Sequence, residues 1–89
     1  MHEGARPRRA PGLVEETLND TLVLTASASE TVHTLNATAA FIFGACDGTQ
    51  TLDAIVSAVA TRYGVPADRV ASDVIATIAQ MVTKGLILS

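Results

Sequence analysis

The stretch that decides the fold runs from residue 13 to residue 35 and reads LVEETLNDTLVLTASASETVHTL. Its central part, residues 21–26, alternates along the chain, with Leu22 and Leu24 on one face and threonine and valine on the other. A period of two residues, in a segment rich in β-branched side chains, is typical of a strand that buries one face. We therefore expect a strand over residues 21–26.

Turn signals on both sides of this strand divide the stretch into three segments. Asn19 and Asp20 tolerate the positive backbone φ of a tight hairpin, and the small residues at 27–29 mark a second turn. The segments outside the turns, 13–18 and 30–35, are then the flanking strands of an antiparallel meander. Three short strands are not stable alone, so the apolar face of the meander must pack on helices.

The rest of the chain is typical of helices, with a start and a stop signal for each. Asn36 is a good N-cap for a strongly apolar segment, and Thr51 is one for a segment whose apolar residues repeat at helical spacing. Gly48, Gly64 and Gly85 can adopt the left-handed conformation in which helices commonly end. These signals predict helices over residues 37–47, 52–63 and 67–84.

Two further features complete the expected fold. The apolar stripe of the second helix extends from Leu52 to Tyr63, and the apolar tail at 86–88 can pack back as a short extended piece. The order of three strands and then three helices predicts an α+β fold that resembles a winged helix-turn-helix, with a three-stranded antiparallel sheet. Residues 13–89 form this one domain, because a chain of 89 residues is long enough for only one.

Charge separates the first residues from the rest of the chain. Residues 1–12 hold two of the three prolines and carry three arginines against one glutamate, a net charge of +2, which predicts a flexible basic arm. Residues 13–89 carry three basic against eight acidic residues, a net charge of −5. A domain that binds duplex nucleic acid normally has the opposite sign. Since the chain has no apolar run long enough to span a membrane and no secretory signal, we expect it in the cytoplasm, with neither a nucleic-acid nor a membrane partner.

The sequence offers no constellation for catalysis or for a metal site. Its single cysteine, Cys46, lies in the apolar first helix, where a structural thiol is expected, and two histidines are too few for structural zinc. Phosphate-binding loops, dinucleotide fingerprints and CxxC pairs do not occur in the sequence. Asp47 and Asp53 flank a turn in the way that helix caps do. We therefore expect neither an enzyme nor a bound cofactor.

A series of short motifs is similar to those of the PqqD family, which is named for its role in pyrroloquinoline quinone biosynthesis. The series reads Leu-Asn-Ala-Thr-Ala-Ala from residue 35, Asp-Gly-Thr-Gln-Thr from residue 47, Arg-Tyr-Gly from 62, Asp-Val from 73 and Lys-Gly-Leu from 84. The Arg-Pro and Ala-Pro-Gly of the first twelve residues also resemble the family's entry segment. The resemblance covers nearly the whole chain, and the meander matches less closely than the helices.

The resemblance implies a function that periodicity alone does not. PqqD-like domains recognise the leader of a ribosomally synthesised and post-translationally modified (RiPP) precursor peptide. They act as peptide chaperones and present that leader to a modifying enzyme, often a radical-SAM protein. In the family the leader adds as a fourth strand beside the third one, in the groove between that strand and the third helix. On this chain the implied leader-binding residues are Thr31, Val32, His33, Thr34, Val70, Asp73, Val74, Thr77, Ile78 and Met81.

The residues themselves are compatible with strand addition. Segment 31–34 contains no proline or lysine that would block pairing at a sheet edge. The apolar stripe of the third helix is too broad for one core, which leaves area for a groove, and Met81 suits variable guests. Simpler alternatives stay open, namely a strand covered in another way, a stripe that lies wholly in the core, and an exposed His33 without a role.

Two other classes of protein stay open as alternatives. A winged-helix DNA-binding regulator has the same architecture, but here the third helix and its end offer only Arg69 and Lys84 as cations. A small acidic carrier protein needs a serine at a helix start, whereas Ser72 lies within the third helix. A free edge strand also allows a homodimer through that edge.

Overall fold

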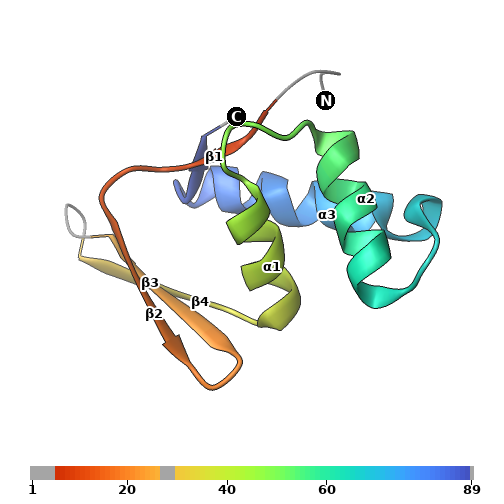
Figure 1. Ribbon diagram of the computed structural model, residues 1–89. Coiled ribbons are helices and arrows are strands. Elements are labelled where there is room, and N and C mark those ends of the chain that lie inside the picture. The colour runs from red at the N-terminus through yellow and green to blue at the C-terminus, as the bar shows by residue number, and fades with distance from the viewer. Residues whose placement is uncertain (1–5, 27–29, 89) are drawn as a thin grey trace.

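The strands and helices follow one another largely as the sequence predicts (Figure 1). The computed structural model describes residues 6–26 and 30–88, so the turn expected at 27–29 lies outside the described residues. The fold is α+β, with a three-stranded antiparallel sheet followed by three helices. The elements are β1 (Arg8–Arg9), β2 (Leu13–Leu18), β3 (Thr21–Ala26), β4 (Thr31–Leu35), α1 (Ala37–Ala45), α2 (Leu52–Tyr63), α3 (Ala67–Thr83) and β5 (Ile87–Leu88).

The sheet has the order β2-β3-β4, with both pairs antiparallel. The hairpin between β2 and β3 turns at Asn19, whose φ of 57° is the positive value expected there. β4 begins at Thr31 rather than at residue 30, because Glu30 has a φ of 55° and leaves the extended conformation. The pairing of Leu22 with Leu35 brings these two leucines to the same face of the sheet.

The helices begin where the sequence predicts. The side-chain oxygen of Asn36 accepts the amide of Ala39 at 2.9 Å, and that of Thr51 accepts the amide of Ala54 at 3.2 Å. These two caps satisfy amides that the first turn of a helix leaves without a partner. Gly64 ends α2 in the left-handed conformation, with a φ of 66°.

Two helices end slightly earlier than predicted. α1 ends at Ala45 rather than at residue 47, because Cys46 has left the helical conformation with a ψ of 72°. α3 ends at Thr83 rather than at residue 84, and Gly85, with a φ of 77°, turns the chain back toward the core. The amide of Leu86 then bonds to the carbonyl of Met81 at 2.8 Å, which closes the end of α3.

The core lies between one face of the sheet and the three helices. α1 packs against β3, β4 and both other helices, so it forms the centre of the molecule. We call the sheet face that bears Leu22, Leu24 and Leu35 the inner face. The most completely buried side chains are Phe43, Leu24, Ile42, Ile55, Leu86, Ile87, Val74, Pro7 and Cys46.

The beginning and the end of the chain form a second, two-stranded sheet. β1 pairs antiparallel with β5, Arg8 opposite Leu88, and Arg8 also bridges to Asp47 on its other side. Pro7 is buried beside them. The expectation of a flexible arm over residues 1–12 therefore needs correction, because residues 7–10 find backbone partners in the tail and in the loop after α1. The expected extended tail, in contrast, is present as β5.

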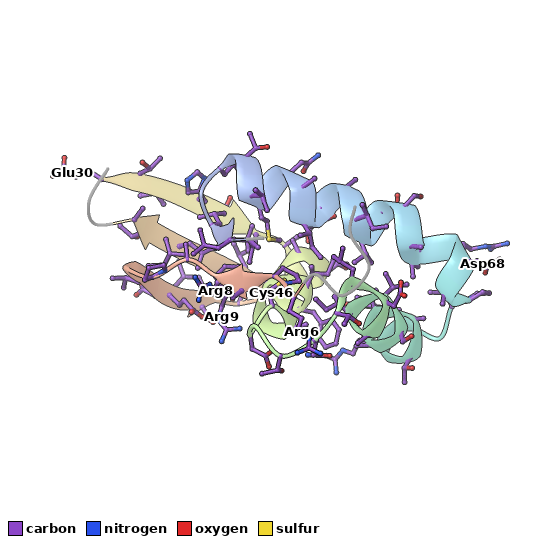
Figure 2. The ribbon with its side chains drawn as sticks, turned by 90° about the horizontal axis from the view of Figure 1, so that it is seen from above. Arg6, Arg8, Arg9, Glu30, Cys46 and Asp68 are labelled. Atoms are coloured by element: carbon purple, nitrogen blue, oxygen red, sulfur yellow. The ribbon has the colours of Figure 1, made fainter. Side chains whose placement is uncertain are left out.

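Arg9 fastens this second sheet to α1 (Figure 2). Its guanidinium group donates to the carbonyl of Gly44 at 2.7 Å and to that of Phe43 at 3.4 Å. The same group lies 5.9 Å from the centre of the Phe43 ring, within the range of a cation–π contact. Arg9 thus supplies a donor to the Gly44 carbonyl in the last turn of α1, and it shares the Phe43 carbonyl with the amide of Cys46.

Candidate functional site

β4 provides an open sheet edge. In the described residues it pairs with β3 on one side, and no strand lies along its other side. Thr31, Val32 and Thr34 are exposed, with Val32 at 59 %, whereas His33 is half-buried on the inner face opposite Leu24. The described part of the N-terminal segment lies on β5 and not on this edge. An extended peptide could therefore satisfy the backbone groups of β4 by adding a strand.

The two edges of the three-stranded sheet differ in charge. β2, the opposite edge, carries Glu15 and Glu16 in its middle, and both are exposed. β4 has no Asp, Glu, Lys or Arg. Charged side chains on an edge strand discourage pairing with a further strand. The sheet is thus protected at β2 and open at β4.

The residues predicted on α3 divide into two groups. Val74, Ile78 and Met81 are 1 %, 3 % and 2 % exposed and belong to the core. Ile78 and Met81 therefore offer no side-chain surface to a guest, which corrects the expectation that Met81 adapts to variable guests. The reason is that the helix spacing brings these side chains to the face of α3 that packs on α1 and α2. Val70, Asp73 and Thr77 remain accessible to differing degrees.

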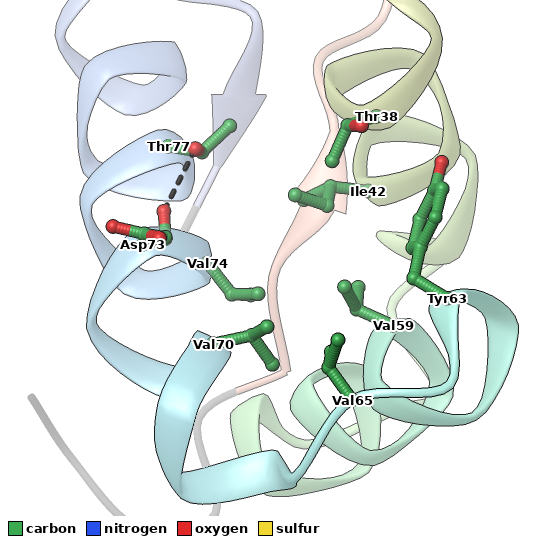
Figure 3. A pocket seen from close by; sticks show the side chains of 9 residues that line it. All are labelled: Thr38, Ile42, Val59, Tyr63, Val65, Val70, Asp73, Val74 and Thr77. Carbon is green, nitrogen blue, oxygen red and sulfur yellow. Dashed lines mark hydrogen bonds between the residues drawn. The ribbon is translucent and has the colours of Figure 1, made fainter.

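A pocket of about 220 Å³ opens where the three helices meet (Figure 3). Val70 and Val74 of α3 form one wall, and Ile42 of α1 and Val59 of α2 form the other. Its surface is mostly apolar. The complete lining is Thr38, Ile42, Val59, Tyr63, Val65, Val70, Asp73, Val74 and Thr77. Four predicted residues, Val70, Asp73, Val74 and Thr77, thus come together here.

The two polar residues predicted for the groove differ in their availability to a ligand. The hydroxyl of Thr77 donates to the carbonyl of Asp73 at 2.8 Å, so its proton is used within α3 (Figure 3). Asp73 is exposed. The pocket therefore offers mainly apolar contact.

Sequence reasoning missed the contributions of α1 and α2 to the pocket. Tyr63 was expected in the apolar stripe of α2 but is 43 % exposed, and its ring meets Phe41 edge to face at 6.3 Å between centres. Thr38 lies in the first turn of α1, three residues after the end of β4. From the sequence, Asn36 and Thr38 indicate only the start of a helix. The pocket beside Thr38 could not be predicted, because it depends on how the three helices pack together.

The β4 edge and the pocket follow each other along one surface. Asn36 is the single residue between β4 and α1, and α1 brings Thr38 and Ile42 to the pocket. Only Asn36 and the first residue of α1 therefore separate the end of β4 from Thr38 in the pocket lining. The edge offers backbone hydrogen bonds, and the pocket offers space for an apolar side chain.

Cys46 and Asp47, in the loop after α1, are held by burial and by hydrogen bonds. Among the described residues, no group of three or more His, Cys, Asp or Glu could hold a metal ion. Burial raises the pKa of the Cys46 thiol from its ordinary value of 9.0 to about 11, so at neutral pH it is a protonated, unreactive group. Asp47 accepts the hydroxyl and the amide of Thr49, which lowers the pKa of its carboxyl group. Asp47 thus stabilises the turn after α1, whereas Thr51 is the cap of α2.

No helix in the described part of the chain is both long and apolar enough to cross a membrane. α3, the helix that a winged-helix regulator would place on DNA, carries Arg69 against Asp68 and Asp73. Its charge thus gives no support to binding of a phosphate backbone.

Two solved structures have a similar fold. The structure described as TbiB1 in complex with the TbiA(beta) leader peptide has a TM-score of 0.78 and 21% sequence identity, covering 90% of this chain and 93% of that chain. The structure described as lasso peptide synthetase B1 complexed with the leader peptide has a TM-score of 0.81 and 21% identity, covering 96% of this chain and 100% of that chain. No curated protein matches the sequence significantly.

The sequence itself carries the assignment to a family. Residues 21–87 match the family model described as coenzyme PQQ synthesis protein D (PqqD). This range includes β3, β4, all three helices and the first residue of β5, and so contains both the open edge and the pocket. The chain therefore belongs to the PqqD family.

Proposed function

We propose that this protein is a non-catalytic recognition element that binds the leader of a ribosomally synthesised precursor peptide by strand addition at β4. The observation that carries the proposal is the uncharged open edge of β4 beside an apolar pocket. Both neighbouring structures were solved with a leader peptide bound, which supports the same class of ligand here.

The β4 edge and the pocket have different roles in this proposal. Main-chain hydrogen bonds to β4 supply affinity for any extended segment, and the pocket selects for sequence. A cavity of ~150 Å³ already accommodates a benzene molecule. The pocket of about 220 Å³ therefore has room for one leucine- or phenylalanine-sized side chain of the leader.

The proposal extends to what the protein does with the bound leader. We infer that it presents the peptide to a modifying enzyme, and we propose a radical-SAM protein as that enzyme. The pathway would be the biosynthesis of pyrroloquinoline quinone or of a related RiPP. Membership of the PqqD family supports this role. On this proposal the chemistry belongs to the partner enzyme.

A titration of ¹⁵N-labelled protein tests the proposal. The ligand is the leader of the short precursor encoded beside the gene, and duplex DNA is the comparison. Saturable amide shifts at residues 31–35, near Thr38 and at Val70 and Thr77 are expected. If the leader produces no shifts and duplex DNA shifts α3, the proposal is wrong and the chain acts as a regulator.

The same edge could also bind a second copy of the chain. Pairing of β4 with β4 of another molecule uses the backbone groups that the leader needs. The homodimer predicted from the sequence is therefore a competitor of the leader. Sedimentation analysis should then show that saturating leader dissociates any dimer.

A further inference from the structure

The face of the three-stranded sheet that points away from the core has no assigned role. We call it the outer face, and the register defines it as three rows across the strands. The first row is Val14, Thr25 and Val32, and the second is Glu16, Val23 and Thr34. Leu18 and Thr21 form the last pair, next to the hairpin turn.

Large apolar side chains are concentrated on this outer face. Val14, Leu18 and Val32 are 57 %, 56 % and 59 % exposed. They are three of the five large hydrophobic side chains that the described residues expose, and the other two stand apart, on α2 and β5. In the first row, Val14 of β2 and Val32 of β4 lie on either side of Thr25 of β3, and the half-buried Val23 lies in the next row. Exposed apolar side chains gathered on one face of a sheet mark an interaction site.

Acidic residues lie on and beside this surface. Glu16 is on the outer face, Asp20 and Glu30 are in the turns next to it, and Glu15 is on the inner face of the same strand as Glu16. No lysine or arginine occurs between Arg9 and Arg62. Within the described residues none of the four acids forms an ion pair, and all four are exposed. In Figure 2, Glu30 lies at the far end of the sheet from the helices. The surface therefore repels nucleic acid and anionic lipid and attracts a basic partner.

We propose that the outer face docks a protein whose contact surface is apolar at its centre and rich in Lys and Arg at its rim. Because this rests on the proposed function, we identify that protein as the modifying enzyme that receives the leader. Apolar contact at the centre with opposite charges at the rim is the usual anatomy of a protein–protein interface.

The geometry lets both ligands bind at once. The helices cover the inner face, and the pocket lies among them, whereas the outer face is on the other side of the sheet. A leader strand added to β4 widens the sheet by one strand. Its alternate side chains then point to the outer face, beside Val32 and Thr34. An enzyme on the outer face would thus contact every second residue of the paired leader segment.

Two matched variants test the docking surface. Glu16 is on the outer face and Glu15 is its neighbour on the inner face of the same exposed strand, so Glu16→Lys and Glu15→Lys change the charge equally. The probe is the purified RiPP-modifying enzyme encoded beside the gene, and calorimetry measures its affinity. We expect Glu16→Lys to weaken binding at least about fivefold and Glu15→Lys less than about twofold, since contact and not net charge matters.

A third variant tests the apolar part of the outer face. Val14→Asp on β2 should weaken binding of the same enzyme at least about tenfold, because it places a charge where an apolar side chain contacts the enzyme. Leader affinity, measured in the same samples, should stay within about twofold of wild type, because β2 is at the opposite edge from β4. A thermal melt confirms that each variant is folded.

The possible results separate this proposal from the proposed function. If the enzyme binds all variants and wild type equally, or does not bind although the leader does, the docking proposal is wrong and leader recognition stands. If the leader does not bind, the proposed function is wrong. If Glu16→Lys and Val14→Asp weaken binding of the enzyme but not of the leader, the docking proposal and the proposed function are both supported.

Discussion

At the scale of single residues, the structure explains why two side chains with reactive or charged groups serve the fold. Arg9 comes from a segment expected to be flexible, yet it makes two hydrogen bonds to the end of α1 and lies over Phe43. Cys46 has no accessible surface, and its burial keeps the thiol protonated. Both residues connect the loop after α1 to the rest of the core.

Arg9→Ala should lower the free energy of unfolding by about 1–3 kcal/mol, because hydrogen bonds from a charged donor and a cation–π contact are lost together. Urea denaturation followed by circular dichroism measures the change. Arg6→Ala is the control, since Arg6 is exposed and should change stability by less than about 0.5 kcal/mol. Equal effects of the two variants would mean that Arg9 does not fasten α1.

The raised pKa of Cys46 predicts a dependence of stability on pH. In the unfolded chain the thiol ionises near its ordinary pKa of 9.0, whereas in the folded chain it stays protonated until about pH 11. Its contribution to stability is therefore complete below about pH 9 and is lost as the pH rises toward about 11. The free energy of unfolding should fall more steeply over this interval in wild type than in Cys46→Ala. Parallel slopes would show that the thiol is not protected by burial.

At the scale of elements, the sequence predicts what is local and misses what depends on tertiary contact. The strands at 13–18 and 21–26 and the helix starts agree with the structure because period and caps are encoded within a few residues. β1 and β5 have two residues each, too few to show any period, and they pair across nearly the whole chain. The pocket was only half predicted, since Thr38, Val59 and Tyr63 meet Val70 through the packing of three helices.

Val70 of α3 offers the most direct test of the pocket, because it is half-buried and lines it. Val70→Asp should weaken leader binding at least about tenfold by placing a charge where an apolar side chain docks. Ala76→Asp is the matched control on the exposed side of the same helix and should change affinity less than about twofold. Fluorescence anisotropy with labelled leader measures both, and an equal loss in both would place the leader elsewhere.

At the scale of the whole molecule, the two ends of the chain hold the core together. The amide of Arg9 bonds to the carbonyl of Cys46, and that of Ala10 to Leu86, both at 2.9 Å. The amide of Gly48 bonds to the carbonyl of Pro7 at 3.1 Å. The segment thus joins the loop after α1 to the tail after α3, which are the ends of two helices that shape the pocket.

Deletion of residues 1–10 should therefore lower the free energy of unfolding by about 2–4 kcal/mol. The backbone hydrogen bonds of Pro7, Arg9 and Ala10 are lost, and the core surface that the buried Pro7 covers becomes exposed. The amides of residues 86–88 should lose protection from hydrogen exchange as well. Had the segment covered β4, its removal would instead have tightened leader binding. A deletion variant as stable as wild type, with tighter binding, would contradict the observed pairing of β1 with β5.

The central claim is that a leader peptide becomes a further strand of the sheet at β4. Hydrogen exchange of the β4 amides, measured by NMR with and without saturating leader, tests this claim most directly. Amides of β4 that do not bond to β3 should become protected at least about tenfold in an alternating pattern, because a strand satisfies every second residue along an edge. Leader binding that leaves the exchange of residues 31–35 unchanged would show that the peptide binds without strand addition and would contradict the account.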